Sequence, residues 1–463
     1  YNVAIGFQAL KDYEDGDGDG HNTAIGANSQ ADATTGQFNV SLGSSSLGGA
    51  ALTGDNNIGL GYQAGFALTS GSNNVAVGHK SLMTEDGNGA NVAIGHQTLK
   101  VQNAGSDAYN VAVGYLAGTA ITTGTHNTVI GGNAGDAITT GSLNTLLGTY
   151  AGTGLTVGVH NTAVGYAALA SEDAHGLNVA IGYQTLTNQN AGANAYNVAV
   201  GYNTGLSVTT GVENVLIGGL AGDALTSGGY NVAVGTSSLS ASTTSSFNVA
   251  VGRSALATNI LGSRNTAIGH QALFTHNVGT AADTYNTAVG YKAGTLITTG
   301  VENTIIGGSA GDAITTGGYN TLMGVHAGGG LVEGTDNVAI GWSALKTENA
   351  HGGNVAIGKE ALKVLDAGAE GYNVAVGLKA GLVMTTGVDN TIVGGLAGDA
   401  LTTGTRNSLF GKNAGSALTT GNYNTVVGYQ ALSDDDQGAF NTAIGYFALE
   451  NYNDGVDNGH NTA

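Results

Sequence analysis

The sequence predicts an all-β fold, a parallel β-solenoid of about 26 coils that are mostly 17 residues long. A phrase of Asn, Val or Thr, Ala, Ile or Val, and Gly recurs at this period and opens 27 times between Asn2 and Asn461. Seventeen residues are too few for a helix, a strand and their connections, and no 3.6-residue periodicity appears. Proline is absent, which fits a continuously hydrogen-bonded stack because each proline would remove a donor.

A second, longer period groups the coils in fives. One coil in each group is lengthened to 19–21 residues, and the groups recur about every 88 residues. We therefore interpret residues 1–463 as one continuous solenoid without internal domain boundaries. Because it begins and ends inside a repeat, we expect it to be a segment of a longer chain. The super-repeats begin near Asn2, Asn91, Asn178, Asn265, Asn354 and Asn441.

Each coil position, counted from the Asn as position one, has an expected role. Positions two to four, such as residues 75–77, predict a short strand in which positions two and four share one face. The Asn at position one tolerates left-handed turns, and its amide can bond to the coils above and below. The Gly at position five fits a corner that needs a positive φ. A second short strand and two turns complete the expected coil. The ladder residues that represent these two columns are Asn22, Asn74, Asn161, Asn265, Asn441, Gly26, Gly78, Gly165, Gly269 and Gly445.

Position three raises the question of what covers the sheet. It lies on the face opposite positions two and four, yet it is Ala in most coils. A solvent-facing column would normally show polar variety. We expect this column to pack against a neighbouring chain, and the alternative is an Ala column inside a thin two-walled roll.

Composition and motifs narrow the class of function. Cysteine is absent, so the chain needs no disulfides, and a net charge of −20 disfavours nucleic acid as a partner. No apolar run is long enough to span a bilayer. We find no nucleophile elbow, zinc-protease motif or phosphate loop, and we expect no enzymatic activity. An enzyme built on this scaffold would need one acidic groove that differs from the rest of the solenoid, and no coil differs enough from the others to form it.

One segment resembles the start of a calcium-binding loop. Asp15, Asp17 and Asp19 alternate with glycine, but the bidentate Glu expected at loop position twelve is replaced by Gly26. Calcium is therefore the one candidate cofactor, and the alternative is an ordinary solvated turn.

The lengthened coils are the expected place for specific recognition, because longer loops on a rigid stack tend to carry binding. Four of these coils end in a tyrosine, and aromatic side chains beside polar loops suit contacts with sugar or protein. The alternative is that the tyrosines only close the turn. Thr pairs in other turns are candidate O-glycosylation sites. The tyrosines are Tyr109, Tyr196, Tyr285 and Tyr372, and representative threonines are Thr122, Thr123, Thr139 and Thr140.

The repeated phrase resembles the head-domain repeat of trimeric autotransporter adhesins, the YadA-like β-roll. The phrases from Asn178 to Leu186 and from Asn441 to Leu449 are also similar to repeats of bacteriophage tail-fibre and bacterial surface proteins. The resemblance covers essentially the whole chain. It implies a left-handed parallel β-roll, three chains to a head, and exposure outside the cell or on a virion.

We therefore expect a non-enzymatic, extracellular or cell-surface fibre protein that is both structural and adhesive. Its expected partners are copies of itself, as a homotrimer or filament, and a cell-surface glycan or matrix protein. Repetition of weak sites in every super-repeat would give avidity in place of one tight pocket. The alternative is a bacteriophage tail fibre that binds a glycan on the host surface.

Overall fold

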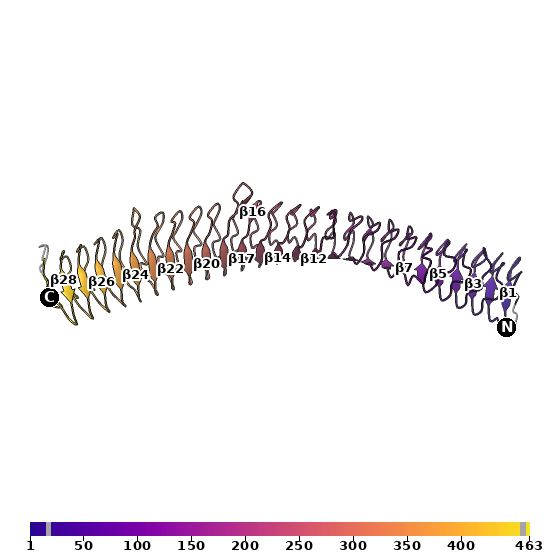
Figure 1. Ribbon diagram of the computed structural model, residues 1–463, viewed down its shortest axis with the longest axis horizontal. Coiled ribbons are helices and arrows are strands. Elements are labelled where there is room, and N and C mark those ends of the chain that lie inside the picture. The colour runs from indigo at the N-terminus through magenta and orange to yellow at the C-terminus, as the bar shows by residue number, and fades with distance from the viewer. Residues whose placement is uncertain (15–19, 454–459) are drawn as a thin grey trace. The chain divides into compact units, whose positions relative to one another are not determined.

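The computed structural model describes residues 1–14, 20–453 and 460–463 and confirms an all-β, parallel solenoid of about 26 turns (Figure 1). The chain forms two compact units, Tyr1–Tyr230 and Asn231–Ala463. The described residues of both units contain no helix, so none of them forms a helix that could cross a membrane.

Outside residues 15–19, the N-terminal unit contains thirteen short strands, one per coil. They are β1 (Val3–Ile5), β2 (Thr23–Ile25), β3 (Val40–Leu42), β4 (Ile58–Leu60), β5 (Val75–Val77), β6 (Val92–Ile94), β7 (Val111–Val113), β8 (Thr128–Ile130), β9 (Thr145–Leu147), β10 (Thr162–Val164), β11 (Val179–Ile181), β12 (Val198–Val200) and β13 (Val215–Ile217).

The C-terminal unit repeats the arrangement and adds one small ladder, formed by β16 (Gly262–Ser263) and β18 (Ala282–Asp283), at its longest coil. The other strands are β14 (Val232–Val234), β15 (Val249–Val251), β17 (Thr266–Ile268), β19 (Thr287–Val289), β20 (Thr304–Ile306), β21 (Thr321–Met323), β22 (Val338–Ile340), β23 (Val355–Ile357), β24 (Val374–Val376), β25 (Thr391–Val393), β26 (Ser408–Phe410), β27 (Thr425–Val427) and β28 (Thr442–Ile444).

Within each unit the strands pair in parallel and in register. Val75 of β5 pairs with Val92 of β6, and the next two residues follow in step. Because successive coils repeat one phrase, each strand meets the same positions in the next coil. Every column of the coil therefore becomes a straight row of like side chains along the unit.

Position three faces the interior of its own chain, so the expectation of an inter-chain contact there is wrong. Ala76, Ala93 and Ala163 are fully buried, and so are the bulkier residues that replace Ala in some coils, such as Leu146 and Ile305. The coil is thin, and leucine or isoleucine from the opposite wall already fills most of the space between the walls. The alternative of an Ala column inside a two-walled roll is correct.

The second wall of each coil is built of turns, not of the second strand that we expected. Its backbone alternates between ordinary and left-handed conformations; in one coil Lys80 and Leu82 have φ of 54° and 47°. Such a zigzag cannot form an extended strand. Hydrogen bonds between coils still join this wall, as from Leu82 N–H to the Thr98 carbonyl at 2.9 Å.

Positions nine and twelve share one space inside the coil. Where position nine is glycine, position twelve is aliphatic or methionine and occupies that space: a Cβ on Gly118 would lie 2.8 Å from Cδ1 of Ile121. Where position nine is leucine, as at Leu82, this leucine is buried and position twelve is usually polar, as at Glu85. A leucine at position nine therefore leaves position twelve available for a polar side chain.

The Asn column forms a hydrogen-bonded ladder inside each unit. The backbone N–H of Asn144 donates to Oδ1 of Asn127 at 3.0 Å, and Oδ1 of Asn144 accepts from the N–H of Asn161 at 2.9 Å. Nδ2 of Asn144 also donates to the carbonyl of Gly158 at 2.9 Å, which closes the coil on itself. The representative residues Asn22, Asn74, Asn161, Asn265 and Asn441 are all buried in this column.

The glycines at position five turn the chain out of the strand at positive φ. Gly165 has a φ of 131°, and a Cβ on it would lie 2.3 Å from the carbonyl oxygen of Gly182 in the next coil. Both the backbone conformation and the close approach of the next coil therefore require glycine. Gly26, Gly78, Gly269 and Gly445 share this conformation.

Candidate functional site

The outward side of the strands is an uncharged surface in each unit, with an apolar column at position four and a mixture of Val, Ile, Thr and Ser at position two. Positions two and four form it, and we call these two columns the strand face. Position two is Val, Thr, Ile or Ser, and position four is Ile, Leu, Val, Met or Phe in every coil. Leu147 is 45% exposed and Met323 is 43% exposed. Although the chain carries a net charge of −20, no charged residue stands on the strand face.

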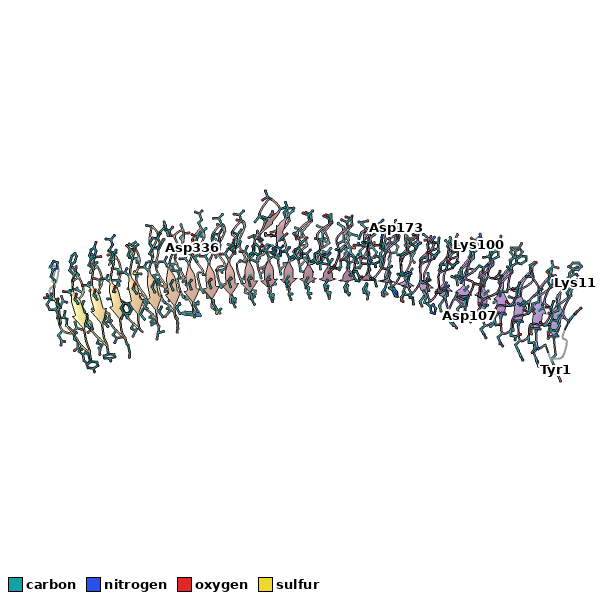
Figure 2. The ribbon with its side chains drawn as sticks, viewed as in Figure 1. Tyr1, Lys11, Lys100, Asp107, Asp173 and Asp336 are labelled. Carbon is teal, nitrogen blue, oxygen red and sulfur yellow. The ribbon has the colours of Figure 1, made fainter. Side chains whose placement is uncertain are left out.

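Charged side chains lie at other parts of the coil. Lys100 and Asp173, for example, project from the turns on the edge opposite the strands (Figure 2). The two columns of the strand face therefore carry no charge, whereas exposed charges such as Glu213 and Arg264 stand beside them, immediately before the ladder Asn. A continuous apolar row of this kind usually marks a surface that another molecule covers.

Stacked rings border the strand face at position six. Tyr166, Tyr183 and Tyr202 stack with centroids 5.3 and 5.4 Å apart, and His79 and His96 stack at 5.0 Å. Because each ring lies face to face with the ring of the next coil, these rows present ring edges to solvent. They extend the apolar border and leave few free ring faces on which a sugar could stack.

The four tyrosines expected at the lengthened coils stand immediately before the ladder Asn, on the strand side of the coil. All four are exposed and have left-handed backbone, with φ between 45° and 52°. Tyr285 also donates a hydrogen bond to Asp283 at 3.3 Å, and Asp283 pairs with Arg264 at 2.9 Å. Tyr109, Tyr196, Tyr285 and Tyr372 thus occupy equivalent places, one per super-repeat, far apart along the chain.

Only some of the candidate glycosylation threonines are exposed, and the candidate calcium ligands are not among the described residues. Of the candidate glycosylation sites, Thr123 and Thr140 are exposed, whereas the hydroxyls of Thr122 and Thr139 donate to carbonyls of the next coil at 3.1 and 3.2 Å. Asp15, Asp17 and Asp19, the candidate calcium ligands, lie outside the described residues.

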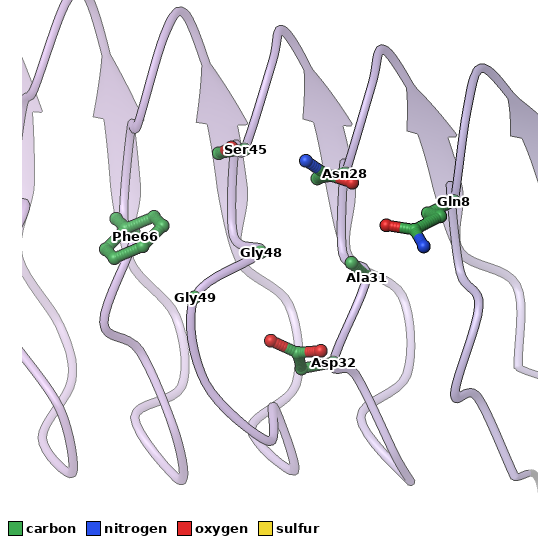
Figure 3. Close-up of a pocket in the computed structure, with 8 residues that line it drawn as sticks. All are labelled: Gln8, Asn28, Ala31, Asp32, Ser45, Gly48, Gly49 and Phe66. Carbon is green, nitrogen blue, oxygen red and sulfur yellow. The ribbon is translucent and has the colours of Figure 1, made fainter.

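A groove lies in the N-terminal unit, beside the coil that Gly48 and Gly49 widen (Figure 3). It has a volume of about 340 Å³ and is open to solvent, with Asp32 as its only charged lining residue. Phe66 forms its apolar wall, and Gln8 and Asn28 supply amides. It brings together no pair of groups that could act as acid and base.

Buried polar side chains at position twelve cap the turn that follows them. Oε1 of Glu172 accepts a hydrogen bond from the backbone N–H of His175 at 3.2 Å, and Oε1 of Glu85 accepts one from Asn88 at 3.3 Å. Asn259 caps its turn in the same way, through an N–H three residues later at 3.0 Å. The buried polar residues at position twelve are Glu85, Gln102, Glu172, Gln189, Ser242, Asn259, His276, Glu348 and Asp435.

Burial at position twelve makes ionisation costly. Desolvation raises the pKa of Glu85 to about 7, against the lowering effect of its hydrogen bonds with Asn88. Desolvation likewise raises the pKa of Glu172 and of Glu348. For His276 it disfavours the charged imidazolium and lowers the pKa to about 4.

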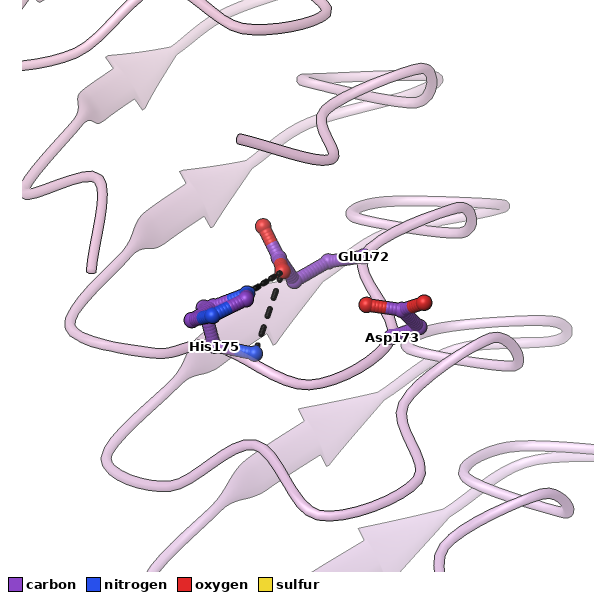
Figure 4. Close-up of side chains that lie close together, drawn as sticks. All are labelled: Glu172, Asp173 and His175. Carbon is purple, nitrogen blue, oxygen red and sulfur yellow. Dashed lines mark hydrogen bonds and ion pairs between the residues drawn. The ribbon is translucent and has the colours of Figure 1, made fainter. Parts of the chain in front are cut away.

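Two of these acids belong to clusters that also contain a histidine. In the N-terminal unit Glu172, Asp173 and His175 place their ligand atoms within 4.8 Å of one another (Figure 4). In the C-terminal unit Glu348, His351 and Asp366 do the same. We call these two sets the His–carboxylate clusters. The glutamate is fully buried in each, and the histidine side chain is 29% exposed.

Our reading of the sequence missed the acids at position twelve, although two signals could have found them. Glu85 and Glu172 stand 87 residues apart, and so do Glu348 and Asp435. Each also follows a leucine by three residues, whereas a glycine at that place predicts an aliphatic residue. No family model, no curated protein and no solved structure matches this chain.

Proposed function

We propose that the protein is a non-enzymatic structural fibre that assembles with copies of itself through the strand face. The observation that carries this proposal is the apolar, uncharged row that each unit exposes along all of its strands. We further propose that the assembly stands outside the cell or at its surface, as the resemblance to YadA-like adhesin heads implies. There it would present repeated attachment sites.

A second copy is the partner that fits the strand face best. Every position of this face recurs at the strand spacing, and only a molecule of the same spacing could meet it row by row. Thirteen strands about 4.8 Å apart make a face about 60 Å long, and strand plus borders are about 15 Å wide. Roughly 900 Å² on each partner equals a standard specific interface.

The prediction is that the chain forms a stable multimer. Light scattering coupled to chromatography should give a native mass that is a small multiple of the 45.6 kDa chain. Replacing Leu147 and Ile181 together by lysine should shift the protein to monomer, since two charges would then be buried in an apolar interface. The matched control replaces Thr123 and Thr140, which are exposed on turns, by lysine and should leave the mass unchanged.

The outcome also separates the proposed assemblies. A trimer would support the adhesin-head resemblance, and a larger, concentration-dependent mass would support a filament. A monomer that persists at high concentration, with the lysine variant behaving identically, would contradict self-assembly. The exposed tyrosines at the lengthened coils support the alternative function, a bacteriophage tail fibre. Glycan-array binding that is lost in Tyr196→Ala would favour it.

A further inference from the structure

We propose that each His–carboxylate cluster binds a divalent transition-metal ion of the zinc type. Glu172, Asp173 and His175 would hold one ion in the N-terminal unit, and Glu348, His351 and Asp366 would hold one in the C-terminal unit. This inference is independent of the proposed self-assembly, because the clusters lie in turns and not on the strand face.

The donor types select the class of ion. One imidazole nitrogen and two carboxylates suit Zn²⁺ and its neighbours, whereas Ca²⁺ and Mg²⁺ prefer sites made of oxygen alone. Three protein ligands would leave one position of a tetrahedral ion for water.

Two buried atoms without a hydrogen-bond partner support the site in the N-terminal unit. Oε2 of Glu172 is buried and lacks a hydrogen-bond partner, and so does Nδ1 of His175. Nδ1 of His175 lies 3.7 Å from Oε1 of Glu172, and Nδ1 of His351 lies 3.6 Å from Oε1 of Glu348. Both distances exceed a hydrogen bond, so the nitrogen and the carboxylate face each other without a direct bond. A metal ion would use the nitrogen lone pair and the carboxylate charge together.

The required movement is small and falls on the two side chains that are not fully buried. Ligand atoms around a tetrahedral Zn²⁺ are about 3.4 Å apart, given bonds of about 2.0–2.2 Å. The present spread of up to 4.8 Å must therefore shrink by up to about 1.4 Å. Asp173 is exposed and His175 is partly exposed, so both can rotate, while Glu172 stays fixed in the interior (Figure 4).

The same turn in other super-repeats lacks the full set of ligands and serves as an internal comparison. Glu85 and Asp86 supply both carboxylates in the first of these turns, but Asn88 stands where His175 stands in its coil. The turn of Asn259 has neither acid nor histidine. The histidine is therefore the residue that distinguishes the two proposed sites from their relatives.

Isothermal titration of the full chain with Zn²⁺ alone tests the proposal. We expect the wild-type chain to bind two Zn²⁺ ions. Either single variant, His175→Gln or His351→Gln, should bind one ion, and the double variant should bind none with comparable affinity. His160→Gln, a histidine outside the clusters, should leave two. Titration with Co²⁺ should give the visible absorption of a tetrahedral site, and the double variant should lose it. A double variant that still binds two ions with unchanged affinity would overturn the proposal.

A gain of function provides a second, independent test. Asn88→His completes the set with Glu85 and Asp86 and should raise the stoichiometry from two to three. If N88H binds no third ion while folding normally, histidine does not determine the site and the assignment fails. Ca²⁺ at a hundredfold excess should not displace Zn²⁺, and displacement would show a site selective for oxygen ligands instead.

Discussion

Replacing Asn144 by alanine is expected to destabilise the N-terminal unit by about 3 kcal/mol, among the largest effects of any single change in the chain. The alanine leaves the N–H of Asn161 and the carbonyl of Gly158 buried without their partners, and each such group costs about 1–3 kcal/mol. It also opens a small cavity in the ladder. Chemical unfolding followed by circular dichroism measures the loss.

The matched control is Asn103→Ala, because Asn103 is exposed and outside the ladder. Its effect should stay within about 0.5 kcal/mol. Hydrogen exchange adds a spatial test, since protection should fall mainly in the coils that begin at Asn127, Asn144 and Asn161. Each coil contacts chiefly its neighbours in such a stack. Equal stability of the two variants would show that the ladder contributes little.

The change Glu85→Gln is expected to stabilise the protein at pH 8 but not at pH 4. The pKa of Glu85 is raised from 4.5 to about 7 in the folded chain, so the folded state disfavours the ionised carboxyl. The stability that the neutral acid contributes is fully present below pH 4.5 and is lost as the pH rises through 7. A shift of this size corresponds to about 3 kcal/mol above pH 7.

Glutamine at position twelve should not show this loss, because its side chain is neutral at every pH. Its amide oxygen can still accept the hydrogen bond from the N–H of Asn88. The native Asn259 already shows that a neutral amide fits this column. Melting temperatures measured from pH 4 to pH 9 give the test, with Glu213→Gln as an exposed control. Curves for wild type and E85Q that stay parallel over the whole range would contradict the raised pKa.

The solenoid and its columns were predictable because each follows from a local rule that the period repeats. Asn at position one and glycine at position five have one conformational role each, and 26 copies make that role visible. The second wall could not be predicted as turns, since leucines such as Leu82 do not usually adopt left-handed backbone. Contacts with the neighbouring coils over-determine this conformation.

The direction of the strand was the main error, and its cause is physical. The small Ala at position three suggested a contact with another chain, but in so thin a coil it fills the interior against the opposite wall, as the larger Leu146 and Ile305 do in other coils. Thr at position two, as in Thr128 and Thr145, was the sign that this face points outward. The His–carboxylate clusters escaped notice for another reason. In the C-terminal cluster Asp366 comes from the coil after Glu348 and His351, and spacing along one coil cannot reveal it, whereas the three residues of the N-terminal cluster lie within one turn.

Hydrogen bonds that run along the stacking direction give each unit a particular response to mechanical load. The bond from Thr128 N–H to the Asn144 carbonyl, 2.8 Å long, is one of a row in which every coil hangs from the next. Tension along this row acts on all coils in series, and because each coil contacts chiefly its neighbours, the coils detach one after another. A detached coil of 17 residues can extend to about 55 Å from a height of about 4.8 Å. Such a unit dissipates a pull in many small, equal steps, each of which can close again when the pull relaxes.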